Sequence, residues 1–388
     1  MKEIKNGSGD ITIQLYGAVY NSNLLELYSA FGPEFVKYID GDFALVLQDR
    51  RTNVMVVAVD AFASKPLWLK YSENDLIEVF DYPAPGANEK LRANTYKTYC
   101  NGYFGSGSSV SVSNVVDWDL TQNVKTYDKW IEAFEESIAK RTKDVADQLF
   151  IGLSSGYDSG CIACELKKQN IPFEAYTLIA NENMLIIARR QAFHRHNYYS
   201  YQITKQEYLD YSNYVINNGV DYECLTNHWR GSDVIQWKYN YKFDKASAGD
   251  AFVCDMGNRA ARSIMLSGQG SDEIFSDYGQ AGRQHYSQSQ LGGLFPDDLA
   301  SVFPYGNFDK GTMDAYIAKT EFIGRLYGVE ARYPYLDVDL VQEFLHLTPE
   351  LKNANYKAPL YEYFARNDYP FDKGVKEGFG ANRNLIQE

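Results

Sequence analysis

Two short stretches of this chain place small hydroxyl and glycine residues beside acidic residues, directly after an apolar run. The first is FIGLSSGYDSGC at residues 150–161, and the second is SIMLSGQGSDE at residues 263–273. Small residues let backbone N–H groups approach an anion closely, and the start of a helix adds partial positive charge. Both stretches therefore favour loops that bind phosphate groups.

In the first loop, the hydroxyl and glycine residues would cradle pyrophosphate oxygens; they are Ser154, Ser155, Gly156 and Ser159. A carboxylate would repel that pyrophosphate unless a divalent cation lay between them, so Asp158 is interpreted as a Mg²⁺ ligand. Taken alone, the stretch fits an ordinary Gly/Ser turn with an Asp cap equally well.

The second loop repeats this order of residue types. It follows an apolar run with Ser267, Gly268, Gly270 and Ser271, and then Asp272 and Glu273. Two such units in one sheet favour a nucleotide with Mg²⁺ over two chance turns. Neither loop matches the G-x-x-x-x-G-K-[ST] or G-x-G-x-x-G pattern.

The elements around these loops indicate a parallel sheet with crossover helices. An amphipathic helix is predicted from Asp128, with Trp130, Phe134 and Ile138 on one face. Strand-like and helix-like segments then alternate, including a long helical region from Lys205. In such sheets, ligands gather at the carboxyl ends of the strands, where both loops would lie.

The first hundred residues or so have a different pattern. Residues 10–20 alternate like a strand, residues 23–31 have helical spacing, and residues 41–62 predict a hairpin with its tip at 49–53. Residues 102–113 are rich in Gly and Ser and predict turns and a domain boundary.

Length, charge and cysteine content limit the class of protein. The 388 residues favour two domains, and a formal net charge of −13 argues against a general nucleic-acid binder. No apolar run approaches a membrane span, and the five cysteines indicate reduced thiols in a cytoplasmic protein. The basic stretch at 187–196, with His194 and His196, is expected to be a solvated helix face.

Four co-linear motifs resemble the asparagine synthetase superfamily. LSSGYDSG resembles the PP-loop S-G-G-x-D-S of ATP pyrophosphatases, and LSGQGSDEIF looks like the S-G-E-G-S-D-E segment of asparagine synthetases. Residues 327–352 are similar to the E-x-R-x-P-[FY]-L-D stretch, and residues 373–381 to the lysine-bearing loop near the C-terminus. Upstream, residues 31–69 resemble the latter half of a class II glutamine amidotransferase domain.

This resemblance implies an α/β fold of two parts. Residues 125–388 would form a PP-loop synthetase domain with a parallel sheet, and residues 1–110 a smaller β-rich domain of the Ntn type. The chain begins MKEIKNG rather than with the nucleophilic Cys, and Tyr16 and Ala18 replace the family's Asn and Glu. We therefore expect a truncated, inactive glutaminase domain, as in the β-lactam synthetase-like relatives.

The resemblance also implies an ATP-dependent, AMP-forming amide ligase that adenylates a small-molecule or peptide carboxylate and transfers the acyl group to ammonia or another amine. ATP and Mg²⁺ would be its cofactors, with no nucleic-acid or membrane partner and with a homo-oligomer as one arrangement. The metal ligands would be Asp158 and Asp272. The implied ATP and pyrophosphate site comprises Leu153, Ser154, Ser155, Gly156, Asp158, Ser159 and Gly268.

The implied catalytic residues are Glu330, Lys376 and Gln269. Lys376 would neutralise charge on the phosphates or the acyl oxygen. Gln269 cannot accept a proton, so Glu330 would act as the base alone, or the chain would have lost amide synthesis and be a silent nucleotide-binding homologue. A buried salt bridge from Glu330 to Arg332 or another arginine is an equally weighted structural alternative. Residues 180–261 should line the acyl pocket, and they lack the Arg-Ala-Ser-like segment that would bind aspartate.

Overall fold

The structure of the chain is a computed structural model. It describes residues 2–20, 23–72, 77–100, 109–143, 145, 148–179, 182–194, 197–260 and 263–373. The chain divides into two compact units, an N-terminal unit of residues 1–118 and a C-terminal unit of residues 119–388. Mixed α/β content, with a five-stranded parallel sheet and a six-stranded antiparallel sheet as the largest two, confirms the expected α/β class.

The N-terminal unit is built on an antiparallel sheet in the order β1-β2-β3-β4-β8-β9, with a smaller sheet in the order β6-β5-β7. Its elements are β1 (Lys2–Lys5), β2 (Ile11–Val19), α1 (Leu24–Phe31), η1 (Gly32–Tyr38), β3 (Gly41–Asp49), β4 (Val54–Val59), β5 (Trp68–Tyr71), β6 (Ile77–Phe80), β7 (Glu89–Lys90), β8 (Thr95–Cys100) and β9 (Ser109–Asn114). The predicted strand, short helix and hairpin are confirmed in β2, α1 and β3–β4.

One expectation for this unit is wrong. Residues 109–113 were expected to form turns, but they belong to β9, which pairs antiparallel with β8. β9 alternates Ser with Val and lies at the edge of the sheet with most of its residues exposed. The alternation of Ser with Val is typical of a strand, but the Gly- and Ser-rich composition of residues 102–113 favoured turns, and an exposed edge strand has no apolar face to outweigh it.

The C-terminal unit contains a parallel sheet in the order β12-β11-β10-β15-β18. Its strands are β10 (Gln148–Gly152), β11 (Glu174–Leu178), β12 (Tyr198–Tyr201), β15 (Ser263–Leu266) and β18 (Val329–Arg332). The main helices are α2 (Asp128–Thr142), α3 (Tyr157–Lys168), α4 (Met184–His194), α5 (Lys205–Asn218), α6 (Ser247–Gly257), α7 (Ser271–Phe275), α8 (Thr312–Leu326), α9 (Val338–His346), α10 (Pro349–Lys352) and α11 (Ala358–Asn367). The prediction of a parallel sheet with crossover helices is confirmed.

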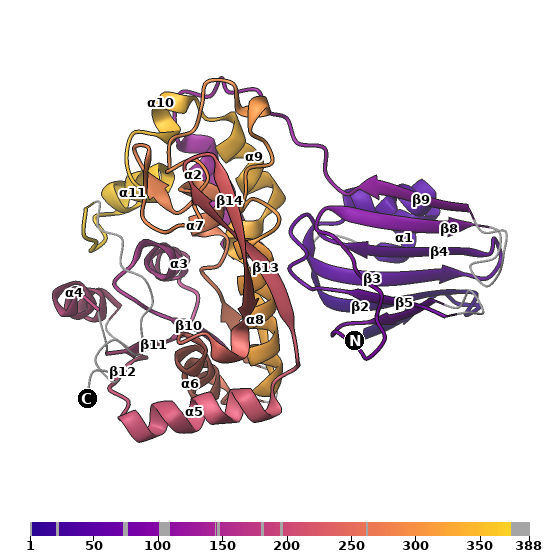
Figure 1. The fold of residues 1–388 in the computed structure, drawn as a ribbon, viewed down its shortest axis with the longest axis horizontal. Coiled ribbons are helices and arrows are strands. Elements are labelled where there is room, and N and C mark those ends of the chain that lie inside the picture. Colours follow the sequence, from indigo (N-terminus) through magenta and orange to yellow (C-terminus); the bar gives the residue numbers. More distant parts are fainter. Residues whose placement is uncertain are drawn as a thin grey trace. The chain divides into compact units, whose positions relative to one another are not determined.

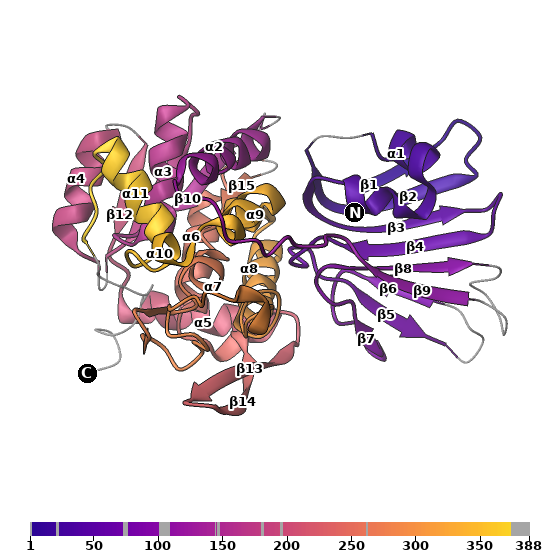
Figure 2. The same cartoon turned by 90° about the horizontal axis from the view of Figure 1, so that it is seen from above.

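Helices cover both faces of this sheet, as Figures 1 and 2 show, with α2 and α3 on one side of β10 and α5 and α6 on the other. Trp130, Phe134 and Ile138 of α2 are each 0% exposed, and burying each contributes about 2 kcal/mol. Because β10 and β15 are parallel neighbours, the segments that follow them leave the same edge of the sheet side by side.

The region after Lys205 is helical only to Asn218. It continues into a two-stranded hairpin, β13 (Glu223–Arg230) and β14 (Asp233–Asn240), which sequence periodicity did not predict. Two-residue elements β16 (Gly279–Gln280) and β17 (Arg283–Gln284) follow α7. Within the described ranges, every helix is too short or too polar to cross a bilayer.

Candidate active site

The loop between β10 and α3 is folded on its own hydroxyl groups. The backbone N–H of Ser154 donates to Oγ of Ser159 at 3.0 Å, and the two hydroxyls share a hydrogen bond of 2.9 Å. The N–H of Gly156 donates to Oγ of Ser154 at 3.2 Å. Asp158 follows in the first turn of α3, so hydroxyls, backbone N–H groups and one carboxylate gather at a helix N-terminus.

Arg190 holds this loop through its backbone carbonyl groups. Its Nη1 donates to the carbonyl oxygen of Ser154 and, at 2.9 Å, to that of Gly156. The side chain is 0% exposed, and its guanidinium lies 5.6 Å from the ring of Phe364 and 5.2 Å from that of Tyr369. The expected solvated face at residues 187–196 is therefore wrong at Arg190.

The same correction applies to His194, which is 6% exposed and shares a 2.7 Å hydrogen bond with the hydroxyl of Tyr369. Burial lowers the pKa of His194 to about 4, so the ring is neutral at pH 7. His196 lies outside the described residues. Basic residues at helical spacing predict a solvated face, but Arg190 contacts the loop after β10 and His194 contacts Tyr369 after α11, so both side chains are buried.

Ser155 ties the loop to the segment before α4. Its N–H and its hydroxyl both donate to Oε2 of Glu182 at 2.5 Å, and its Oγ accepts from the N–H of Asn183 at 3.1 Å. The residue is 6% exposed. Ser155 therefore holds the loop in place rather than facing the cavity described below.

The loop between β15 and α7 reaches the first loop directly. A Cβ built on Gly268 would lie 2.9 Å from Cβ of Asp158, so the two loops are in contact and a side chain here would part them. Gly270 has a φ of +94°, and a Cβ there would lie 2.2 Å from Cδ2 of Leu336. Glycine at both positions is required by the close approach of other parts of the unit.

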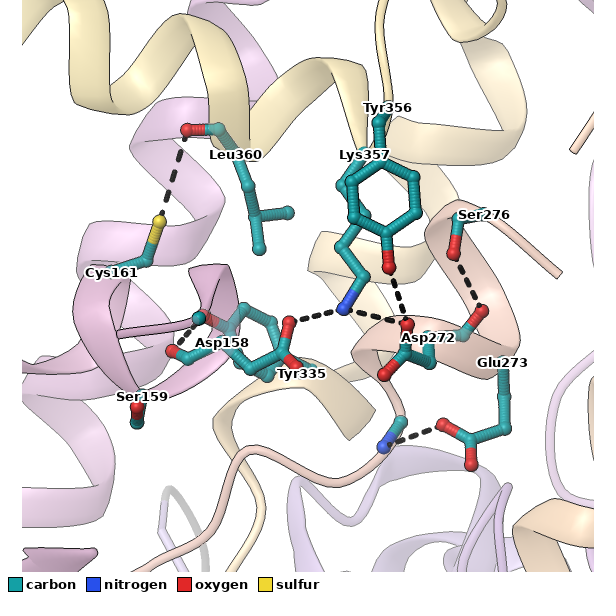
Figure 3. Close-up of polar contacts among 12 residues, drawn as sticks. Asp158, Ser159, Cys161, Asp272, Glu273, Ser276, Tyr335, Tyr356, Lys357 and Leu360 are labelled. Carbon is teal, nitrogen blue, oxygen red and sulfur yellow. Dashed lines mark hydrogen bonds and ion pairs between the residues drawn. The ribbon is translucent and has the colours of Figure 1, made fainter. Parts of the chain in front are cut away.

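A buried lysine that sequence reasoning missed joins the two loops (Figure 3). Nζ of Lys357 contacts Oδ1 of Asp158 and lies 2.9 Å from Oδ1 of Asp272, with the lysine side chain 1% exposed. Burial disfavours the charged form, but the two carboxylates outweigh it and raise the pKa of Lys357 above its usual value. The hydroxyl of Tyr356 donates to Oδ1 of Asp272 at 2.8 Å.

The donor chemistry of Asp158 and Asp272 fits Mg²⁺. In phosphate-transfer sites this ion takes one or two carboxylates and completes its shell with phosphate oxygens and water. Among the described residues, no group of three or more His, Cys, Asp or Glu could hold a metal. The two expected ligands lie close together, with the Lys357 ammonium between them.

A cavity of about 370 Å³ opens beside the two loops. Its loop side includes most of the residues singled out in the sequence, namely Ser154, Gly156, Asp158, Ser159, Gly268, Gln269 and Asp272. The opposite wall comes from α6 and the residues before it, from α8, and from residues after α7, including Asp244, Asp250, Tyr278, Tyr316 and Lys319. Asp244 and Asp250 come from the region expected to supply the acyl pocket.

The remaining predicted residues lie elsewhere. Leu153 is buried and does not line the cavity, and Lys376 lies outside the described residues. Glu330 forms an ion pair with Arg332, with Oε1 2.8 Å from Nε, and Nη1 of Arg332 donates to the carbonyl oxygen of Arg141 at 2.5 Å. Glu330 is not part of the cavity wall, which matches the salt-bridge alternative.

Comparisons with known proteins show which proteins this chain is similar to in sequence. Residues 7–79 match the family described as a glutamine amidotransferase domain. The chain is 23% identical over 362 residues to a putative glutamine-hydrolysing asparagine synthetase of Methanocaldococcus jannaschii, covering 86% of this chain and 60% of that protein. It is 23% identical to the asparagine synthetase of Sandersonia aurantiaca, covering 85% of this chain and 60% of that protein.

A third relative, asparagine synthetase 2 of Lotus japonicus, is 24% identical, and the match covers 85% of this chain and 54% of that protein. The chain thus spans 60% or less of the length of these three relatives. The matches run through both units, so they confirm the family resemblance carried by the sequence motifs.

Proposed function

Because this chain belongs to the asparagine synthetase-like superfamily, a ligase family, we propose that it is an ATP-dependent, AMP-forming amide ligase. It would adenylate a substrate carboxylate, release pyrophosphate, and pass the acyl group to ammonia or another amine. The observation that supports the proposal is the meeting of the two loops at Asp158 and Asp272 through Lys357, with a shared cavity beside them.

The first loop would act as the PP-loop and hold the pyrophosphate portion of ATP. Ser154 and Ser159 offer hydroxyl groups, and Gly156 caps a helix of 12 residues whose N-terminus favours negative charge. Arg190 would act through the loop backbone, because it binds the carbonyl groups of Ser154 and Gly156 and so fixes the conformation of the loop.

Charge on the departing pyrophosphate needs compensation. Asp158 and Asp272 would hold Mg²⁺, which supplies Lewis-acid stabilisation of phosphate oxygens when bound. Lys357 adds a permanent positive charge to the same pair of loops and keeps the carboxylates from repelling each other. Lys376 remains a proposed phosphate or acyl-oxygen ligand.

We assign Gln269 to orienting the acyl group or the amine, because it lines the cavity and its amide can donate and accept hydrogen bonds. Glu330 is poorly placed to act as the base. Its carboxylate pairs with Arg332 and lies outside the cavity wall, so its role here is structural.

The N-terminal unit would not hydrolyse glutamine through the positions where the resemblance places the family's Asn and Glu. Tyr16 and Ala18 occupy these positions on β2, opposite Ala44 and Asp42 of β3. The ring of Tyr16 packs beside a buried cluster, with Nζ of Lys65 at 5.8 Å from its centroid. The proposal therefore implies that the amine is supplied directly and not as ammonia released from glutamine.

A silent nucleotide-binding protein is the second candidate, and it is favoured by Gln269 and by the lysine that bridges the two carboxylates. The two candidates are separated by incubating the protein with ATP, Mg²⁺ and a panel of carboxylic acids and amines. Equimolar AMP and pyrophosphate that depend on one acid would support the ligase. ATP binding without turnover across the panel would support the silent homologue.

A further inference from the structure

We propose that the α6–α8 wall of the cavity is a binding site for a positively charged group, an alkylammonium or a guanidinium, of the substrate. This inference rests on the proposed function for the claim that a substrate enters the cavity. The wall itself consists of Asp244, Asp250, Lys319, Tyr278, Tyr286 and Tyr316.

The wall has two carboxylates and one ammonium. Nζ of Lys319 lies 3.0 Å from Oδ2 of Asp250 and 3.5 Å from Oδ2 of Asp244, and its side chain is 7% exposed. Lys319 is the only Lys, Arg or His among the described residues that line the cavity. One positive charge is therefore shared by two carboxylates whose side chains are 20% and 30% exposed.

Asp244 is the better satisfied of the two carboxylates. Its Oδ1 accepts from the N–H of Ala246 at 2.9 Å, and its Oδ2 accepts from the hydroxyl of Tyr239 at 2.6 Å. Burial disfavours its charged form, but Lys319 and these donors outweigh burial and lower the pKa of Asp244. Asp244 is thus a fixed negative charge in the wall.

Asp250 is the less well compensated of the two carboxylates. Its Oδ2 is buried and receives no aligned hydrogen bond from the described residues, although Lys319 is within ion-pairing distance. Burial raises the pKa of Asp250 in spite of that ammonium. The Asp250 side chain is 30% exposed and lines the cavity, so its carboxylate can accept a charge-assisted hydrogen bond from a cationic ligand.

Aromatic rings complete the wall. Nζ of Lys319 lies 5.0 Å from the centroid of Tyr316, and the rings of Tyr278 and Tyr286 are 6.0 Å apart at 89°. Ring faces attract cations, so tyrosines beside carboxylates favour an organic cation over an anion. The second carboxylate of an acid such as aspartate would instead meet Asp244 and Asp250, because Lys319 is already paired with both.

The test measures binding directly, without ATP, so that it does not depend on turnover. Isothermal titration would compare 6-aminohexanoate with hexanoate and adipate, and would include 1,5-diaminopentane. We expect 6-aminohexanoate to bind about tenfold more tightly than either other acid, the effect of one charge-assisted contact. Equal binding of the three acids, or no binding of either cationic probe, would overturn the inference.

Variants test whether the binding preference depends on Asp250 itself or only on whether the protein is folded. Asp250→Asn should reduce the preference for 6-aminohexanoate to less than about threefold, whereas Asp255→Asn, an exposed position on the same helix, should retain it. Lys319→Gln should strengthen the binding of 1,5-diaminopentane, because both carboxylates then lack their ammonium. A preference that survives in Asp250→Asn, or weaker binding in a folded Lys319→Gln protein, would count against the site.

Turnover then tells which reactant carries the positively charged group. If pyrophosphate release requires 6-aminohexanoate, the group belongs to the acid. If 1,5-diaminopentane is consumed together with an acid that has no ammonium group, such as hexanoate, the group belongs to the amine. If the cations bind and no condition gives turnover, the ligase proposal fails while the cation site stands. Turnover that ignores charge on both reactants would refute the cation site alone.

Discussion

Nζ of Lys357 lies 2.9 Å from Oδ1 of Asp272, and the same ammonium contacts Asp158 (Figure 3). Two loops that are separated by more than a hundred residues in the sequence thus share one counter-ion, which comes from a third segment just before α11. This contact keeps the carboxylates close without metal, and it sets the geometry into which a nucleotide and Mg²⁺ would bind.

Replacing Lys357 with Met should impair both stability and activity. The change leaves two carboxylates facing each other with no ammonium, and breaking a buried ion pair costs about 3–5 kcal/mol. Urea denaturation would measure the lost free energy of unfolding. Lys129→Met removes an exposed lysine of α2 and should change it by less than about 0.5 kcal/mol. Equal stability of the two variants would show that Lys357 does not hold the loops together.

Gly270→Ala should destabilise the C-terminal unit more than Gly231→Ala. Both glycines have positive φ, +94° and +64°, but only Gly270 would bring a Cβ within 2.2 Å of Leu336, while Gly231 has open space. Strain alone costs about 1–2 kcal/mol, and overpacking adds about 1–3 kcal/mol. The free energies of unfolding of the two variants give the difference.

A second substitution checks the cause of this effect. Leu336→Ala combined with Gly270→Ala should lower the free energy of unfolding by less than the sum of the two single changes, because the atom that clashes with the new Cβ is removed. If the two changes simply add, the contact between these residues is not what requires glycine.

Arg190→Met should weaken ATP binding, because the carbonyl groups of Ser154 and Gly156 lose the guanidinium that orients the loop. We expect a loss of about tenfold or more in affinity for ATP, measured by titration calorimetry, since charge-assisted hydrogen bonds contribute about 1.5–3 kcal/mol each. Arg189→Met changes the exposed neighbour on α4 and should bind ATP normally. Similar affinities in both variants would argue against a positioning role for Arg190.

The stability of the C-terminal unit should rise with pH because of Lys352. Its Nζ donates to Oε1 of Gln122 at 2.6 Å and to the carbonyl oxygen of Leu345 at 2.8 Å, and burial lowers its pKa to about 7 from 10.5. Between these values the unfolded chain binds more protons than the folded one, so the unfolding free energy increases with pH. Below pH 7 the full penalty for charging the buried amine applies.

Lys352→Met isolates this effect. Compared with the variant, the wild-type protein should gain about 1 kcal/mol per pH unit between pH 7 and 9, as followed by urea denaturation. The lost hydrogen bonds shift the variant by the same amount at every pH, so only the slope matters. A difference that is constant over this range would contradict the lowered pKa.

The parts of the site that sequence analysis found are local ones. Each loop joins a buried strand to a helix, so strand, turn and carboxylate are encoded within about ten residues, and both loops meet as predicted because β10 and β15 are neighbours. The sequence shows that Gly268 and Gly270 are small residues. It does not show why glycine is needed there, because the side chains that leave no room for a Cβ, those of Asp158 and Leu336, belong to other segments.

The missed parts depend on contacts between distant segments. Lys357 stands in a stretch with no phosphate-binding pattern, and its role follows only from the approach of α11 to both loops. Arg190 was misread because a run of basic residues resembles a solvated helix face. Lys319 and Asp250 form their pair across α8 and α6, and neither helix alone predicts it.

The most direct test of the account is pyrophosphate release by Asp158→Ala with ATP, Mg²⁺ and the acid that gives turnover in the wild-type protein. Asp233→Ala, an exposed position at the start of β14, serves as the matched control. The account predicts a loss of at least about a hundredfold in Asp158→Ala and normal turnover in Asp233→Ala. Wild-type turnover in a folded Asp158→Ala protein would contradict the assignment of the two loops to a shared nucleotide and metal site.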